Sequence, residues 1–293
     1  MPTTLSRPCP LCGSPERTNM PIPKDQYLAR CRACGMVYVG HEPSVQELTE
    51  YYAPYPVVEN ISPVTLVRYD ELLDRFSAYK KAGKILDVGC GGGSFLERAM
   101  AKGWQACGTE FGAGPIAACR AKGIQVLEGP LRPEDHPAEG YDVICAFEVV
   151  EHLTHPGPEI DKMLKLLRPG GLLYITVPNF NCLARRVDQA HWNVINYPEH
   201  LNHFTPRTLH RLLAGKGLRR SWLTTTGFSL ERWMAKGKNN KATKVEAHQA
   251  QDQFREKIES RLHLRLAKGT INFFLDLFGL GDSLKAAYIK PSA

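Results

Sequence analysis

The sequence lacks several features that would assign it to a class at once. No apolar run approaches the roughly 20 residues that a membrane-spanning helix needs. Its first ten residues carry no hydrophobic core of the kind found in a signal peptide. The formal net charge of +7 over 293 residues permits an acidic partner but is too small to require nucleic acid. These absences predict a cytoplasmic protein without a membrane span.

A disulfide framework is not expected either, because the nine cysteines cannot all pair. Four of them form two C-x-x-C-G knuckles, at residues 9–13 and 31–35. Two knuckles at this separation suit one tetrahedral Zn²⁺ bound by four thiolates, a closed shell with no open position for catalysis. A redox dithiol is the alternative. The sequence therefore predicts a structural zinc ribbon whose ligands are Cys9, Cys12, Cys31 and Cys34.

The clearest ligand chemistry lies where an apolar run, 84–88, ends in the glycine-rich stretch 87–93. A helical pattern follows at 94–102. Glycines let the backbone approach a ligand without a Cβ in the way, and the helix N-terminus offers unpaired N–H groups. This strand, turn and helix predict a nucleotide-type cofactor site.

Strand and helix patterns then alternate, which predicts a mostly parallel sheet covered on both faces. The second strand ends at Glu110, some twenty residues after the glycine turn, where a carboxylate can accept both hydroxyls of a ribose. Leu131 follows the third strand at a position where side chains would flank an adenine ring. We expect strands at 84–88, 106–110, 125–127, 141–147, 171–177, 218–226 and 281–290.

Asp87, two residues before the first glycine, separates this stretch from a dinucleotide fold, which usually has an apolar residue there. The segment 87–93 resembles motif I of class I S-adenosylmethionine (SAM)-dependent methyltransferases, and Glu110 matches their ribose-binding acid. The segment 147–153, Phe-Glu-Val-Val-Glu-His-Leu, resembles the one after strand four in the quinone-methyltransferase-like branch. The segment 167–173 is similar to their turn before strand five. The resemblance runs from about residue 84 to 228.

The resemblance implies an α/β fold: a Rossmann-like, seven-stranded, mostly parallel sheet whose last strand is antiparallel. Zinc knuckles also precede this domain in the family. One departure is Pro130, where many relatives have an acid that contacts adenine. The expected units are a zinc ribbon (1–42), a linker with lid or core helices (43–83), the SAM-binding core (84–230), a helical insertion (231–280) and the closing strand (281–293). The expected cofactor-binding residues are Asp87, Gly89, Cys90, Gly91, Glu110, Phe111, Leu131 and Phe147.

Methyl transfer from a sulfonium needs alignment and exclusion of water rather than an enzyme nucleophile, but a hydroxyl or protonated amine acceptor needs a base. One candidate group is Glu148, Glu151 and His152, whose spacing would place them on one helical face beyond strand four. His152 could be the base. The three could instead hold a divalent cation, as the resemblance allows, or Glu151 could cap the glycine loop.

The second candidate group lies in the long loop after strand five, which brings three histidines, a carboxylate and aromatics into a short span. His200 or His203 is the preferred base, with the other orienting a neighbour. The alternative for either histidine is a buried one that hydrogen-bonds the loop.

The insertion opens with four lysines and later contains the apolar segment 271–278. It could be a substrate lid, a homodimer surface or a membrane-surface helix. A lysine run is most often a solvated face, but it would suit a phosphorylated or nucleotide-linked acceptor. The lysines are Lys236, Lys238, Lys241 and Lys244.

Together these patterns predict a SAM-dependent methyltransferase that acts on a small molecule: a sugar, a quinone-like compound or a natural-product intermediate. O- or N-methylation is favoured over C-methylation. One alternative is an RNA-modifying methyltransferase, although no aromatic motif of the RNA-recognition type is present. The other is a non-catalytic module that binds SAM without transferring its methyl group.

Overall fold

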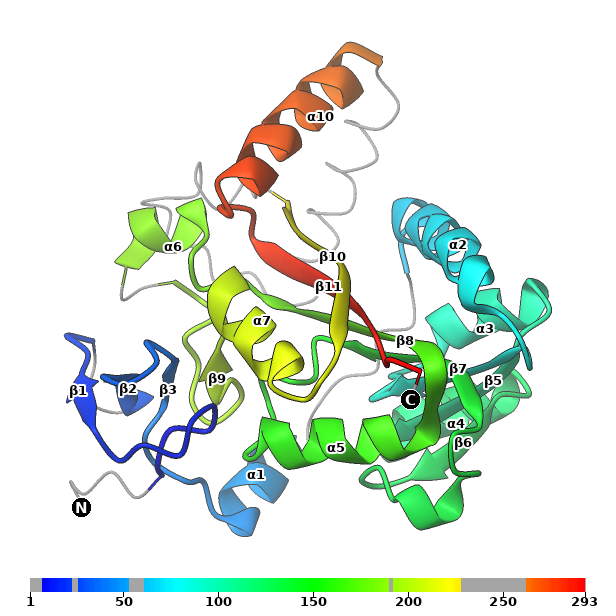
Figure 1. Cartoon of the computed structure of the whole chain (residues 1–293), viewed down its shortest axis with the longest axis horizontal. Helices are drawn as coiled ribbons and strands as arrows, with labels where there is room; N and C mark the ends of the chain where they lie inside the picture. The colour runs from blue at the N-terminus through cyan, green and yellow to red at the C-terminus, as the bar shows by residue number, and fades with distance from the viewer. Residues whose placement is uncertain (1–6, 23–25, 53–60, 190–191, 228–261, 293) are drawn as a thin grey trace.

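The computed structural model describes residues 7–22, 26–52, 61–189, 192–227 and 262–292 (Figure 1). Two sheets organise these residues. The larger sheet has the strand order β10-β11-β8-β7-β4-β5-β6. Its strands are β4 (Lys84–Val88), β5 (Gln105–Glu110), β6 (Gln125–Glu128), β7 (Tyr141–Phe147), β8 (Leu167–Pro178), β10 (Arg219–Thr226) and β11 (Ser283–Ile289).

The pairing within this sheet confirms the predicted architecture. β4 runs parallel to β5 and β7, β5 to β6, and β7 to β8, whereas β11 is antiparallel to both β8 and β10. β7 and the second half of β8 are mostly apolar and almost wholly buried, because helices cover both of their faces. All strand carboxyl ends except that of β11 therefore meet at one edge, where ligands bind in open α/β sheets.

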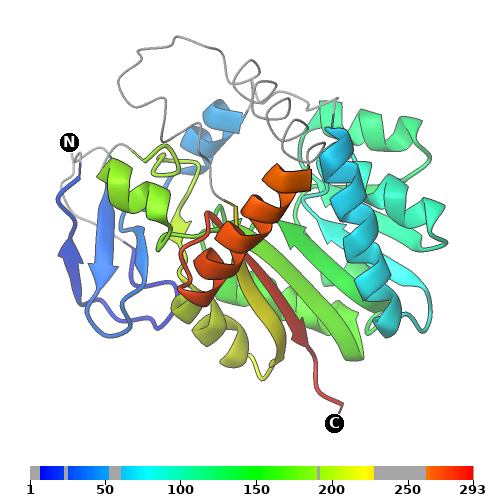
Figure 2. The ribbon, with the colours of Figure 1, turned by 90° about the horizontal axis from the view of Figure 1, so that it is seen from above.

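Two buried clusters of apolar side chains fill the two faces of the sheet. α5 and α7 cover one face, and α2, α3 and α4 cover the other (Figure 2). α2, predicted as either a lid or a core helix, buries Leu73 and Phe76 and packs on α3. The helices are α1 (Val45–Tyr52), α2 (Pro63–Phe76), α3 (Ser94–Ala101), α4 (Ala113–Ala121), α5 (Pro156–Leu166), α6 (Leu183–Asp188), α7 (Pro206–Ala214) and α10 (Leu262–Leu277), with short 3-10 turns at Ser77–Tyr79 and Pro133–Asp135.

One strand boundary differs from the prediction. β8 begins at Leu167, so the glycines expected to form a turn before the strand lie within it, paired across to Lys290. Of the predicted insertion, α10 is the described helix, and it projects away from the sheet (Figure 1). The four lysines that open the insertion lie outside the described residues. Across the described parts of the chain, no helix is long and apolar enough to cross a membrane.

The smaller sheet, which we call the ribbon sheet, carries the cysteine knuckles. Its order is β1-β2-β3-β9, with every neighbouring pair antiparallel. The fourth strand comes from the histidine loop: Val37 lies opposite His203 and Tyr38 opposite Asn202. The predicted zinc ribbon therefore shares its sheet with a candidate catalytic segment, at one end of the larger sheet (Figures 1 and 2). The strands are β1 (Arg17–Asn19), β2 (Leu28–Cys31), β3 (Val37–Val39) and β9 (Asn202–His203).

Candidate active site

The glycine turn after β4 is tied to the end of β5. The amides of Gly89 and Cys90 both donate to the carbonyl of Thr109, at 2.9 and 3.0 Å. Gly89 has a φ of 72°, and a Cβ there would lie 2.7 Å from Val149 Cγ2. The missing side chain of Gly89 therefore lets the residues after β7 pack directly on the turn.

Gly91 is the glycine of this turn that faces open space. Its φ is 52°, and apart from Gly91 itself and its two chain neighbours no described atom lies within 4 Å of the position that a Cβ would take. Its amide donates to Glu110 Oε2 at 2.8 Å, while Glu110 Oε1 accepts from the amides of Phe111 and Gly112. Phe111, 71% exposed, follows this carboxylate directly. A carboxylate, a bare backbone and an accessible aromatic ring thus lie together at one sheet edge.

Asp87, near the carboxyl end of β4, is a buried carboxylate with one oxygen that lacks a hydrogen-bond partner among the described residues. It is 2% exposed, and its Oδ1 has no hydrogen bond in the described part of the chain. Burial, followed by the charge of Glu110, raises the pKa of Asp87 well above its usual value. A ligand with positive charge or N–H groups at this position would relieve both the repulsion and the unmet acceptor.

The side chains of three other predicted cofactor residues are less accessible at this open edge. Leu131 is 3% exposed and belongs to the buried core. The ring of Phe147 is half-buried and lies 4.8 Å from that of Phe95. Cys90 Sγ lies 3.8 Å from Cys119 Sγ. The sequence-predicted residues that gather at the open edge are therefore Asp87, Gly89, Gly91, Glu110 and Phe111, together with the backbone of Cys90.

The segment 148–154, which we call the post-strand turn, follows β7 directly. It is not helical, so the expectation that Glu148, Glu151 and His152 share one helical face is wrong. Glu148 instead has a left-handed φ of 52°, and its amide bonds back to Thr176 on β8. Glu148 is near enough for its charge to act on Glu151, but it is not one of the residues whose possible ligand atoms converge.

Glu151, His152 and His200 form one cluster, with a possible ligand atom of each within 4.8 Å of the others. The ring of His152 lies 4.7 Å from that of His200. His152 Nδ1 bonds to the carbonyl of Glu199 and His200 Nδ1 to that of Val194, both at 2.8 Å. Because a carbonyl can only accept, each Nδ1 carries the proton and each Nε2 holds the lone pair.

The electrostatics of the cluster favour uncharged groups. Glu151 is 1% exposed, and neither of its carboxylate oxygens has a hydrogen-bond partner within the described residues. Burial, then the neighbouring charge of Glu148, raises the pKa of Glu151 well above its usual value. Burial and the proximity of His200 lower the pKa of His152 to about 4. The cluster can accept a proton or a cation through nitrogen and oxygen lone pairs.

His203, the other candidate base, lies on β9 and is not one of the residues whose possible ligand atoms converge in this cluster. It is 3% exposed, its ring is 5.4 Å from that of Phe180, and its Nε2 is buried without a hydrogen-bond partner in the described chain. Burial is the main cause that lowers the pKa of His203 to about 3. The structure thus brings His200 to Glu151 and His152, and places His203 within the ribbon sheet.

The residue whose carbonyl bonds to His152, Glu199, belongs to a group of hydrogen-bonded side chains that the sequence did not predict. Tyr51 on α1 donates its hydroxyl hydrogen to Glu199 Oε2 at 2.5 Å, and the Asn196 amide donates to the same oxygen at 2.5 Å. Burial, followed by the bond to Glu199, raises the pKa of Tyr51 to about 12. The loop that orients His152 is therefore tied to α1. No local pattern connects residues so far apart in the sequence.

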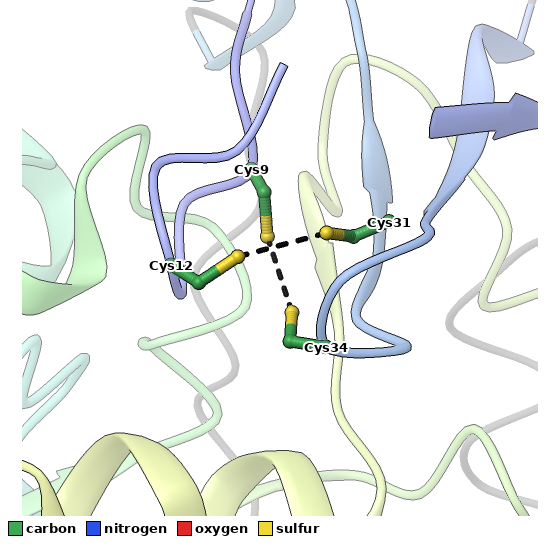
Figure 3. A group of neighbouring side chains, drawn as sticks. All are labelled: Cys9, Cys12, Cys31 and Cys34. Atoms are coloured by element: carbon green, nitrogen blue, oxygen red, sulfur yellow. Dashed lines mark hydrogen bonds between the residues drawn. The ribbon is translucent and has the colours of Figure 1, made fainter. Parts of the chain in front are cut away.

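The four knuckle cysteines converge on one point, as Figure 3 shows. Sγ of Cys9 lies 3.5 Å from Sγ of Cys34, and Sγ of Cys12 lies 3.6 Å from Sγ of Cys31. All four sulfurs lie within 4.8 Å of one another. A tetrahedral zinc with Zn–S bonds of about 2.3 Å separates its sulfurs by about 3.8 Å, so these thiols fit such an ion.

Comparisons with known proteins agree with this geometry. A family model described as "Methyltransferase domain" matches residues 65–220. A ubiquinone biosynthesis O-methyltransferase of Aeromonas salmonicida (strain A449) is 28% identical over 151 residues, which are 49% of this chain and 60% of that protein. The match thus spans less than two thirds of the relative.

Two solved structures share the fold. The first is a SAM-dependent methyltransferase from Archaeoglobus fulgidus, with a TM-score of 0.52 and 19% identity, covering 77% of this chain and 94% of the other. The second is phosphoethanolamine N-methyltransferase 2 of Haemonchus contortus, in complex with SAM. Its TM-score is 0.51 at 14% identity, over 85% of this chain and 58% of the other.

Proposed function

The chain belongs to the family of methyltransferase domains, whose model matches more than half of it, and on this basis we propose that it methylates a small molecule with SAM. One observation carries the proposal. The open cofactor edge and the Glu151–His152–His200 cluster are neighbours, because Val149 of the post-strand turn packs on Gly89 of the glycine turn. SAM, the methyl donor, and a base in this cluster would therefore lie next to each other.

The residues at the open edge fit SAM. Bound SAM supplies an electrophilic methyl group on a positively charged sulfonium. Glu110 would accept the ribose hydroxyls, and the exposed ring of Phe111 would lie against the adenine. The unpartnered Oδ1 of Asp87 would accept an N–H from the ligand, whose positive charge would favour the ionised carboxylate.

His200 is the proposed base. The Val194 carbonyl fixes its proton on Nδ1, so that Nε2 can take a proton from an acceptor hydroxyl as the methyl group transfers. His152, held in the same tautomer by Glu199, is the second candidate. His203 is the least suited of the three, because it is buried in the ribbon sheet.

We infer O-methylation of a quinone-like or other hydroxyl-bearing acceptor. The support is the likeness to proteins named ubiquinone biosynthesis O-methyltransferase. RNA modification and a non-catalytic SAM-binding role are not favoured by these relatives. A phosphorylated or nucleotide-linked acceptor, a homodimer and a cytoplasmic location stay predictions.

A divalent cation is a second proposed occupant of the acceptor site. The group that suits it is Glu151, His152 and His200 rather than the predicted Glu148, Glu151 and His152. Two unpartnered carboxylate oxygens next to two imidazoles are a ligand set for a transition metal or Mg²⁺. For the cysteines we propose one structural Zn²⁺, which the sulfur spacing supports.

Titration calorimetry with SAM, followed by methyl transfer from labelled SAM, tests the proposal. We expect Asp87→Ala to weaken SAM binding at least tenfold, since the buried acceptor is lost. The acceptor panel would hold catechols, hydroquinones and sugar nucleotides, with bulk RNA as a comparison. An unchanged dissociation constant in Asp87→Ala would refute the cofactor site. Tight SAM binding without transfer to any acceptor would favour the non-catalytic alternative.

A further inference from the structure

Arg7 connects the start of the ribbon to the post-strand turn. It lies two residues before Cys9 and is 1% exposed. One guanidinium nitrogen donates to the carbonyls of Val39 and Leu201, at 3.3 and 3.1 Å. The other donates to the carbonyls of Leu153 and Thr154 in the turn, and to Asn202 Oδ1 at 3.0 Å. One side chain thus bonds β3, the β9 segment and the turn.

Asn202 on β9 makes a second connection to the same turn. Its side-chain amide donates to the carbonyls of Val150, Glu151 and Leu153, at 3.2, 3.3 and 2.6 Å. Its backbone amide also donates to the carbonyl of Glu151, at 2.9 Å. Because its Oδ1 accepts from Arg7, the two side chains form one unit.

The post-strand turn depends on this unit because it has no regular structure of its own. The bonds to its Val150 and Glu151 carbonyls are buried and those to its Leu153 and Thr154 carbonyls are half-buried, and a buried carbonyl without a donor is strongly unfavourable. Arg7 and Asn202 supply most of the donors, and the backbone amide of Leu201 adds one to the carbonyl of Glu151, at 2.8 Å. The position of Glu151 and His152 relative to His200 is therefore set by residues of the ribbon sheet rather than by β7.

We propose that Arg7 and Asn202 are positioning residues through which the cysteine ribbon holds Glu151 and His152 against His200. The inference rests on the proposed function for the role of that cluster. If Arg7 and Asn202 have this role, the arrangement of Glu151, His152 and His200 requires a metal ion bound to the four cysteines. The route runs from Cys31 at the end of β2, across β3, to Asn202 on β9.

Dependence on the metal follows from the size of the ribbon. Three short strands and a few apolar side chains cannot form a stable core alone, and metal binding to such units is coupled to their folding. Loss of the metal would release β3 and the backbone near Arg7. Both connections to the post-strand turn would then fail together.

Hydrogen exchange read by mass spectrometry tests the proposal without an acceptor. The variants are Arg7→Met, which removes the donors, and Asn202→Asp, which keeps the shape but loses the amide. In both we expect peptides covering 148–155 to exchange about tenfold faster or more. Arg7→Lys, which keeps a charged donor, should give an intermediate rate. The dissociation constant for SAM should stay within about twofold, because Asp87 and Glu110 are untouched.

Arg168→Met is the matched control. Arg168 is another largely buried arginine, which donates to Asp142 and to the carbonyl of Tyr79, but it lies at the start of β8, away from the carboxyl ends of the strands. We expect it to lower overall stability without a selective change at 148–155. Wild-type protein stripped of metal by a chelator should show the same local change as Arg7→Met.

Three results would overturn the proposal: wild-type exchange at 148–155 in both variants, an equal local change in Arg168→Met, or wild-type exchange there in the metal-free protein. If Arg7→Met fails to fold, Asn202→Asp and Arg7→Lys still decide the question. Failure of the proposed function would look different, because wild-type protein would not bind SAM while the exchange pattern still held. With an acceptor in hand, the variants should lower kcat and leave the KM for SAM unchanged.

Discussion

The two edges of the site are built in different ways. The cofactor edge comes from one continuous βαβ unit, in which Asp87, Gly91 and Glu110 lie within about twenty residues and the Gly91 amide donates to the Glu110 carboxylate. The acceptor edge joins Glu151 and His152 to His200, some fifty residues away. Arg7, near the start of the sequence, bonds the carbonyls of Leu153 and Leu201, which lie next to His152 and His200 in the chain. The first is a local motif, whereas the second exists only in the folded protein.

Each edge nevertheless contains a buried carboxylate whose pKa is raised first by burial and then by a second acid. At the cofactor edge Asp87 is paired with Glu110 and lies beside the open Gly91. At the acceptor edge Glu151 is paired with Glu148 and lies beside two imidazoles. The same electrostatic device thus suits a cationic ligand at one edge, and a proton or metal ion at the other.

The largest expected effect of a single substitution is on the acceptor edge. Replacement of the proposed base, His200→Ala, should lower kcat by about 10²–10⁴-fold while the Kd for SAM stays unchanged. His155→Ala is the control, since His155 is 60% exposed and pairs with Glu42 outside the cluster. Steady-state kinetics with the acceptor found in the panel give the comparison. Wild-type turnover in His200→Ala would move the base to His152.

A smaller effect is expected at the cofactor edge. Glu110→Ala should weaken SAM binding on the order of 100-fold, because two hydrogen bonds to a charged carboxylate are lost. The exchange rate of the post-strand turn should not change. Glu128→Ala is the control, because Glu128 lies opposite Glu110 on β6 but is exposed. Calorimetry measures both, and equal affinity in Glu110→Ala and Glu128→Ala would exclude Glu110 from the site.

The larger sheet could be predicted because its central strands are mostly apolar and are separated by glycine turns and amphipathic helices. The post-strand turn could not. Its acidic and histidine spacing favours a helix, but the donors that satisfy its carbonyls are side chains of Asn202 and Arg7, about 50 and 150 residues away. β9 was missed for the same reason, since a two-residue strand is defined by its partner, β3.

The site residues divide along the same line. Asp87 and Glu110 were found because a glycine turn fixes where the neighbouring carboxylates must lie. The approach of Glu151 and His152 to His200 needs the ribbon sheet, and the bond between Tyr51 and Glu199 needs α1. The spacing of His200 and His203 does not show which of them is better suited as the base, because what distinguishes them is that His203 is buried on β9.

The smallest effect is expected from His203→Phe, a change that tests burial rather than chemistry. The folded protein holds the pKa of His203 at about 3, against 6.5 for an ordinary histidine, so the unfolded chain binds a proton that the folded protein does not. Stability from this group is complete above pH 6.5 and is lost as the pH falls towards about 3.

The phenyl ring introduced by the substitution cannot ionise and should pack against Phe180. Between pH 7 and 5, the free energy of unfolding should therefore fall less in His203→Phe than in wild type, by at most about 1.4 kcal/mol per pH unit. Urea unfolding at both pH values measures this, and an equal fall in the two proteins would mean that His203 takes up its proton without unfolding.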